Sequence, residues 1–397
     1  MTYQRTEKAG LLKRLKDEPR RFLQVIYGPR QVGKTTLVRQ IMEDLDYPHL
    51  LVAADAVPAG DGLWIAQQWE TVRVQQQQQA DKPFLLVIDE VQKIDNWSEQ
   101  IKAEWDKDTA EGWDIRVVLL GSSRLMLQQG LTESLAGRFE STYLGHWSYK
   151  EMKDAFGLTA DEYVWFGGYP GAIVLKDDED RWKSYVRDAL LETSISKDIL
   201  MLTRVDKPAL MKRLFELGSA YSGQILSFTK IMGQLTEAGN TTTLANYLEL
   251  LNDAGLLGGI EKYSPNMVRK RSSSPKFQVH NTAIMSGISK ESLDSLLKNH
   301  EAWGRWVESA VGAHLINQSF KNKKLALYYW REGNDEVDFV VEYNNQVIAL
   351  EVKSGKTGRL SGLKAFDKKL KPEKSLLIGV DGIPWHEFLQ MNVVDLF

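Results

Sequence analysis

One stretch near the start of the chain has the residue types and spacing that phosphate binding requires. Residues 28–35 follow G-x-x-x-x-G-K-[ST] between an apolar run and an apolar, helix-like continuation, a context that favours a phosphate loop over a turn that binds nothing. The glycines allow a tight backbone whose N–H groups face an anion, and the next helix adds its dipole. We expect Lys34 to meet the β- and γ-phosphates, where it also serves catalysis, and Thr35 to offer its hydroxyl to Mg²⁺. The predicted nucleotide-binding residues of the loop are Gly28, Pro29, Arg30, Gln31, Val32, Gly33, Lys34, Thr35 and Thr36.

Hydrolysis of a nucleotide requires a second, acidic element, and the run from Phe84 to Glu90 supplies it. Its apolar part is typical of a central strand in a parallel sheet, and such sheets bind ligands at the carboxyl ends of their strands. We predict that Asp89 organises Mg²⁺ and that Glu90 activates water. A second apolar strand ends at Ser122 and Ser123, which either contact the γ-phosphate or attacking water, or only cap the next helix.

An arginine follows later in the same region. Arg138 is a candidate catalytic residue, because phosphoryl-transfer sites often use an arginine to stabilise charge on the transferred phosphate. A surface salt bridge is the alternative, and the spacing alone favours it.

Two carboxylates and a lysine near the C-terminus form a second candidate site. Two apolar strands flank an Asn-Asn turn, and period-two geometry places Glu351 and Lys353 on one face, where Asp338 of the preceding strand can join them. Glu308, on a predicted helix, is a fourth candidate. Such a set could hold Mg²⁺ through its carboxylates while the lysine steadies the attacking water. The alternative is a strand face whose charges point into solvent.

The elements around these sites suggest four regions. We predict an ATPase-like core at residues 1–155, a helical lid or linker at 156–206, a winged-helix-like module at 207–280 and a C-terminal α/β domain at 281–397. The third region reads as three helices and two strands.

The charge of the winged-helix-like module argues against sequence-specific DNA binding by its helices. Residues 205–264 contain five basic and six acidic side chains, and the presumed recognition helix carries Glu249 and Asp253 but no lysine or arginine. We therefore favour a structural role. The basic loop at residues 269–276 is the exception and could touch a nucleic-acid backbone.

Composition sets the broad class. The chain has 397 residues, a net charge of −3 and no cysteine, which excludes disulfides and cysteine nucleophiles. The six histidines are scattered, which makes a zinc cluster unexpected. No apolar run reaches membrane-spanning length and the first residues are too polar for a signal peptide, so we expect a cytoplasmic protein that does not bind membranes.

Taken together, the motifs resemble a known family. The chain is similar to the prokaryotic ATP-binding proteins that join an AAA-type P-loop domain to the domain of unknown function 4143. The matching stretches are residues 28–35, 86–92, 121–123, 135–140, 166–170, 336–339 and 351–354. The resemblance implies an α/β fold with a P-loop NTPase parallel sheet, then a winged-helix module, then a small α/β domain of the PD-(D/E)xK nuclease type. It places that superfamily's metal-binding acids and lysine at Asp338, Glu351 and Lys353, with Glu308 on its first helix.

The sequence departs from the family pattern at two places. Family members often carry an acidic residue where this chain has Val279-His280-Asn281, and the arginine-finger pattern of hexameric AAA machines is not evident. The second departure weakens any prediction of a ring, and the oligomeric state stays open.

Three hypotheses for function follow. The first is an ATP-driven switch that governs a metal-dependent nuclease-like domain, with ATP and Mg²⁺ as cofactors. The second is a nucleotide-regulated protein whose C-terminal domain holds nucleic acid, either DNA or RNA, or a protein partner without cutting. The third is an ATPase that remodels a protein partner.

Overall fold

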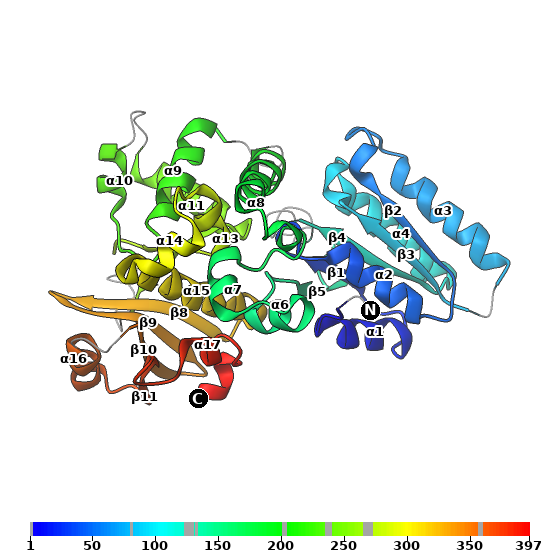
Figure 1. The fold of residues 1–397 in the computed structure, drawn as a ribbon. Helices are drawn as coiled ribbons and strands as arrows, with labels where there is room; N and C mark the ends of the chain where they lie inside the picture. Colours follow the sequence, from blue (N-terminus) through cyan, green and yellow to red (C-terminus); the bar gives the residue numbers. More distant parts are fainter. Residues whose placement is uncertain are drawn as a thin grey trace. The chain divides into compact units, whose positions relative to one another are not determined.

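The computed structural model describes residues 3–79, 82–122, 131, 134–200, 205–234, 240–264, 273–355 and 360–397. Within it the chain divides into two compact units, Met1–Leu144 and Gly145–Phe397. Each unit combines helices with a sheet, which confirms the predicted α/β class (Figure 1).

The first unit is built on a five-stranded parallel sheet with the order β2-β3-β4-β1-β5. The two strands predicted from their apolar runs, β3 and β4, are internal in this order, and both lack an exposed face because helices pack on each side of the sheet. The strands of this unit are β1 (Leu23–Tyr27), β2 (His49–Ala53), β3 (Phe84–Asp89), β4 (Ile115–Gly121) and β5 (Phe139–Tyr143), and its helices are α1 (Glu7–Lys16), α2 (Lys34–Asp44), α3 (Trp64–Gln77) and α4 (Trp97–Glu111).

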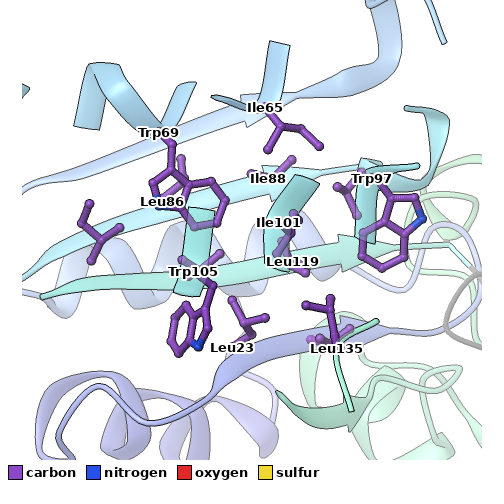
Figure 2. Packing of buried hydrophobic residues seen from close by; sticks show 14 of the residues in the cluster. Leu23, Ile65, Trp69, Leu86, Ile88, Trp97, Ile101, Trp105, Leu119 and Leu135 are labelled. Carbon is purple, nitrogen blue, oxygen red and sulfur yellow. The ribbon is translucent and has the colours of Figure 1, made fainter. Parts of the chain in front are cut away.

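Helices cover both faces of this sheet. Because side chains alternate along a strand, Leu86 and Ile88 of β3 pack with α3 and α4, whereas Leu85 and Val87 pack with α1 and α2. Figure 2 shows the first of these cores, in which three indoles lie among aliphatic side chains. Trp69, Trp97 and Trp105 are buried there, so these indoles pack in the core of the unit.

A buried ion pair fixes α3 to α4. The carboxylate of Asp108 is fully buried and accepts hydrogen bonds from Trp69 Nε1 at 2.7 Å and from Arg73 Nε at 2.9 Å. Arg73 is itself only 3% exposed and also pairs with Glu104 at 2.8 Å. Burying these charges is tolerated only because each has a partner.

The second unit contains a six-stranded sheet with the order β11-β10-β9-β8-β6-β7. None of the helices in the described part of the chain combines the length and the apolarity that crossing a bilayer requires. The strands are β6 (Leu257–Lys262), β7 (Lys276–Val279), β8 (Leu325–Glu332), β9 (Asp335–Tyr343), β10 (Gln346–Lys353) and β11 (Lys374–Gly379). The helices are α6 (Tyr149–Phe156), α7 (Ala160–Phe166), α8 (Glu179–Ser184) with π-helical continuations at Tyr185–Leu191 and Ser194–Leu200, α9 (Pro208–Ala220), α10 (Phe228–Gln234), α11 (Thr241–Asp253), α13 (Ala283–Ile288), α14 (Leu293–Lys298), α15 (His300–Lys321), α16 (Ser361–Leu370) and α17 (Trp385–Phe388).

The helices α9, α10 and α11 followed by the strands β6 and β7 occur in the order that the sequence predicts for the third region. The strand β6 pairs with β7 on one side and, at Glu261 and Lys262, runs parallel to β8 on the other. The strands of the third and fourth predicted regions therefore form one continuous sheet. The four predicted boundaries themselves stay predictions.

The predicted hairpin near the C-terminus is present. Asn344 and Asn345 both have positive φ values, 49° and 67°, as the central residues of a tight two-residue hairpin turn require. The turn sets the register of β9 against β10, with Tyr343 opposite Gln346 and Phe339 opposite Leu350. This register brings Asp338 and Glu351 to the same end of the hairpin.

Candidate functional site

The loop between β1 and α2 has the backbone of a phosphate loop. Gly28 has a φ of 154°, and a Cβ atom there would lie 2.0 Å from the carbonyl oxygen of Leu144. Gly33 has a φ of 91°, and a Cβ atom there would meet nothing within 4 Å. Both residues have positive φ values, which favour glycine. Close packing against Leu144 is a second reason for glycine at Gly28, whereas Gly33 faces open space that a ligand could enter.

The lysine of this loop begins α2 and is 8% exposed. Its Nζ donates hydrogen bonds to the carbonyl oxygens of Gly28 at 2.9 Å and Pro29 at 2.8 Å. The ammonium of Lys34 therefore lies inside the loop, as a cation that meets phosphate must. Val32 is buried beneath the loop, whereas Thr36 is exposed on α2.

The loop and the acidic strand meet through one hydrogen bond. Thr35 Oγ1 donates to Asp89 Oδ2 at 2.8 Å. The pair joins the start of α2 to the end of β3 and presents a hydroxyl and a carboxylate side by side. These are oxygen ligands of the kind that Mg²⁺ takes together with substrate phosphates, so the residues present fit the ion that the loop implies.

A residue that the sequence prediction missed completes this end of the sheet. Gln92 donates through Nε2 to Glu90 Oε2 and, at 3.4 Å, to Ser122 Oγ. Ser122 follows β4 and is 1% exposed, and Glu90 follows β3 with a φ of 54°. Among the residues that the structure describes, the Oε1 atom of Gln92 has no hydrogen-bond partner.

The structure brings Asp89, Glu90 and Ser122 to one edge of the sheet, as predicted. Ser123 lies outside the described residues. Two signals in the sequence could have found Gln92: its place two residues after Glu90, and its position at the end of the family-matching stretch 86–92.

Arg138 is placed elsewhere. Its guanidinium forms two hydrogen bonds to the carboxylate of Asp106 on α4, at 2.8 and 3.0 Å. Its carbonyl oxygen accepts a hydrogen bond from the N–H of Leu23, the first residue of β1, whereas the phosphate loop follows the last residue of that strand. Arg138 therefore lies at the amino ends of the parallel strands, whereas Lys34 lies at their carboxyl ends, and this structure does not bring Arg138 to the loop. The surface salt bridge, the alternative from spacing, is what the geometry shows.

In the second unit, the structure brings the predicted acids together with Lys353. Asp338 Oδ2 accepts a hydrogen bond from the N–H of Val352 at 2.8 Å, and Lys353 Nζ lies 2.7 Å from Glu351 Oε1. Asp338 is 9% exposed and Glu351 is 7% exposed. These values are too low for the alternative of a solvated strand face.

A second lysine, which the sequence prediction did not assign to this site, lies among the same acids. Lys276 Nζ is 2.6 Å from Glu308 Oε1 and 3.6 Å from Asp338 Oδ1, and it donates to the Asp338 carbonyl oxygen at 3.1 Å. The sequence suggested Lys276 as part of a basic loop that could contact nucleic acid. That suggestion is wrong for this residue, because its side chain is fully buried in β7. Residues 269–272 of that loop lie outside the described residues.

Burial and mutual repulsion shift the acids of this cluster. Burial, followed by the nearby carboxylate of Asp338, raises the pKa of Glu308 to about 7 and that of Glu351 to about 7. Burial alone would lower the pKa of Lys276, but Glu308 and Asp338 outweigh it and raise that pKa. Lys353 behaves in the same way, because Asp338 and Glu351 outweigh its burial and raise its pKa.

A divalent metal ion does not fit this cluster as folded. Among the described residues, no three carboxylate or imidazole groups converge in an arrangement that could hold a metal ion. The ammonium of Lys276 already lies against an oxygen of each of two of these acids, 2.6 Å from Glu308 Oε1 and 3.6 Å from Asp338 Oδ1.

Three regions of the chain match known families. Residues 20–153 match the AAA domain, residues 157–294 match a domain of unknown function (DUF8612), and residues 303–381 match a domain of unknown function (DUF4143). The resemblance stated from the motifs, an AAA-type domain followed by domain of unknown function 4143, is confirmed.

Relatives and solved structures add context. The uncharacterized proteins Rv2008c of Mycobacterium tuberculosis and Mb2031c of Mycobacterium bovis are each 26% identical over 343 residues, which cover 85% of this chain and 71% of theirs. The structure of the Aeropyrum pernix ORC1 protein in complex with DNA aligns with a TM-score of 0.33 and 12% identity, over 75% of this chain and 94% of that chain. A structure from work on katanin self-assembly aligns with a TM-score of 0.30 and 16% identity, over 41% of this chain and 56% of that chain.

Proposed function

We propose that this chain, which joins an AAA domain at residues 20–153 to the DUF4143 domain at residues 303–381, binds and hydrolyses ATP with Mg²⁺ and acts as a nucleotide-controlled switch. The observation that carries the proposal is the 2.8 Å hydrogen bond between Thr35 and Asp89. It joins a hydroxyl of the phosphate loop to the carboxylate at the end of β3, the pair that P-loop enzymes use to hold Mg²⁺. The absence of cysteine supports a reducing, cytoplasmic setting.

Each residue of the site has a part in this proposal. The N–H groups of residues 28–35 and the ammonium of Lys34 bind the phosphates. Thr35 and Asp89 would hold Mg²⁺, which when bound neutralises negative charge on the phosphates. Glu90 accepts the proton of the attacking water, and Gln92 holds the Glu90 carboxylate in place through its amide.

The C-terminal domain admits two versions of the switch. In one, Glu308, Asp338, Glu351 and Lys353 cleave nucleic acid with a metal ion under nucleotide control. In the other, the domain holds nucleic acid or a protein partner without cutting. The ion pair between Lys276 and Glu308 favours the second version, because a cation of the chain itself already lies among the acids.

A nucleotide-binding assay and an ATPase assay test the first part of the proposal. We expect Mg²⁺-dependent ATP hydrolysis that disappears in Lys34→Ala, with tight ATP binding lost as well, while Lys16→Ala on α1 behaves as the unchanged protein. Absence of both binding and hydrolysis in the purified chain would refute the proposal.

A cleavage assay separates the two versions. The protein is incubated with single- and double-stranded DNA and RNA, Mg²⁺ or Mn²⁺, and ATP, ADP or no nucleotide. We expect no cleavage in any lane. Cleavage that is lost in Lys353→Ala would establish the nuclease version, and its dependence on Lys34 would show nucleotide control. ATP hydrolysis that only a protein partner stimulates would instead support remodelling of that partner.

A further inference from the structure

The most completely buried charge in the second unit belongs to Lys276. Its side chain has no exposed surface, although lysine is among the residues least often buried. An ammonium in such a place has to be matched by acceptors and by opposite charge, because leaving it unpaired would cost several kcal/mol. The contacts of Lys276 therefore show how the cluster compensates its charge.

Those surroundings supply a full set of partners. The ammonium lies 2.6 Å from Glu308 Oε1, donates to the carbonyl oxygen of Asp338 at 3.1 Å, and is 3.6 Å from Asp338 Oδ1. The ring of Phe339 covers it, with 4.7 Å between Nζ and the ring centroid. The ammonium therefore has one carbonyl acceptor, two carboxylates at ion-pair distance and an aromatic ring around it.

The backbone on both sides holds this lysine in place. Lys276 pairs with Ile260 of β6 in the sheet and forms an isolated bridge with Ile225 on its other side. Phe277, the next residue, accepts a hydrogen bond from Gly223 N and donates one to Gln224 O. This pairing fixes the backbone of Lys276 on both sides, and the contacts to Glu308 and Asp338 hold its ammonium.

Charge then limits what else the cluster can take. Glu308, Asp338 and Glu351 contribute three carboxylates, and Lys276 and Lys353 contribute two ammonium groups that pair with them. A divalent ion between Glu308 and Asp338 would occupy the position of the Lys276 ammonium or lie beside it and be repelled strongly, since the medium there has a low dielectric constant. It would also lack the oxygens that the ammonium already engages.

We propose that Lys276 is the resident cation of the C-terminal acid cluster, in the place that the PD-(D/E)xK resemblance reserves for a metal ion, and that the folded domain binds no divalent metal there. The inference develops the non-cleaving version of the proposed switch. It is independent of whether the first unit hydrolyses ATP.

Metal titration of the nucleotide-free protein tests the inference. Every protein in this experiment carries Asp89→Asn, so that the phosphate loop contributes no metal binding. Binding of Mn²⁺ is measured by electron paramagnetic resonance. We expect no stoichiometric binding by the Asp89→Asn protein. In Asp89→Asn with Lys276→Gln we expect one Mn²⁺ per chain with an affinity raised more than about a hundredfold, because a buried like charge has been removed. Lys262→Gln, on the neighbouring strand, is the matched control and should bind no Mn²⁺.

Thermal unfolding supplies the second readout. Lys276→Gln should unfold at a lower temperature than the control and recover stability on addition of Mn²⁺, because the ion then pairs with the carboxylates that have lost their ammonium partner. Stoichiometric Mn²⁺ binding by the Asp89→Asn protein that Asp338→Asn abolishes would overturn the inference. So would a folded Lys276→Gln protein that gains no Mn²⁺ binding. If Lys276→Gln does not fold, the titration of the Asp89→Asn protein with and without Asp338→Asn decides the question alone.

Discussion

The position of Gln92 makes it the sharpest test of the proposed hydrolysis. Its amide bridges Glu90, the proposed base, and Ser122, the residue after β4. Gln92→Ala should therefore slow the chemical step and leave nucleotide binding unchanged. A residue that acts by positioning the base has this signature.

The size of the effect follows from the bonds that are lost. A hydrogen bond to a charged group contributes about 1.5–3 kcal/mol. If all of it serves to orient Glu90 in the transition state, kcat falls about ten- to hundredfold. The upper limit is set by removal of the base itself, and Glu90→Gln should lower kcat by about 10²–10⁴.

Steady-state ATPase kinetics and equilibrium binding of a fluorescent ATP analogue measure the two quantities separately. Gln67→Ala, on the exposed face of α3, is the matched control for a glutamine-to-alanine change. A Gln92→Ala protein with normal kcat would refute the role of this residue. Loss of nucleotide binding with normal kcat at saturation would show that Gln92 serves the ligand and not Glu90.

Three further predictions concern other parts of the chain. Arg138→Ala should leave kcat within about twofold of the unchanged protein, because its guanidinium is held by Asp106 at the opposite edge of the sheet, and a loss comparable to that of Glu90→Gln would contradict this placement. Arg73→Met should lower the free energy of unfolding by about 3–5 kcal/mol in urea titrations, because it removes two hydrogen bonds to the buried Asp108 carboxylate and leaves Arg20, at 3.9 Å, as the cation beside it; a loss below ~1 kcal/mol would show that Trp69 and Arg20 suffice to stabilise that carboxylate. Burial lowers the pKa of His314 from 6.5 to about 4, so the unfolded chain binds the extra proton between these values and stability should fall by about 3 kcal/mol as the pH drops from 6.5 to 4. His314→Gln should flatten that part of the pH profile, and an unchanged profile would locate the effect in other groups.

The phosphate loop could be predicted in full because its chemistry is contiguous in sequence. Two glycines, Lys34 and Thr35 fall within eight residues, and the flanking strand and helix carry their own periodicity. The hairpin with Asp338 and Glu351 was equally accessible, because a two-residue turn and period-two alternation fix which side chains share an end.

Lys276 could not be assigned in the same way. It stands 62 positions before Asp338, in a strand whose neighbours in the sheet cannot be inferred from local pattern. In the sequence it ends a run of basic and small residues, and that context suggested a solvent-exposed loop. Arg138 shows the converse limit, because its residue type suited phosphate chemistry while the direction of β5 carried it to the wrong end of the sheet.

The parallel pairing of β6 with β8 has a consequence for how this chain can be divided or inherited. The DUF8612 match supplies β6 and β7, and the DUF4143 match supplies β8, β9, β10 and β11, yet the six strands lie in one sheet. In a fragment limited to residues 303–381, the edge of β8 that pairs with β6 would be uncovered. An uncovered edge strand pairs with other chains and promotes aggregation. The same cut would remove Lys276 and leave the carboxylates of Glu308 and Asp338 facing each other without their cation. We therefore expect a recombinant gene that exchanges the DUF8612 region or the DUF4143 region alone to encode an insoluble protein. The two regions should be inherited together.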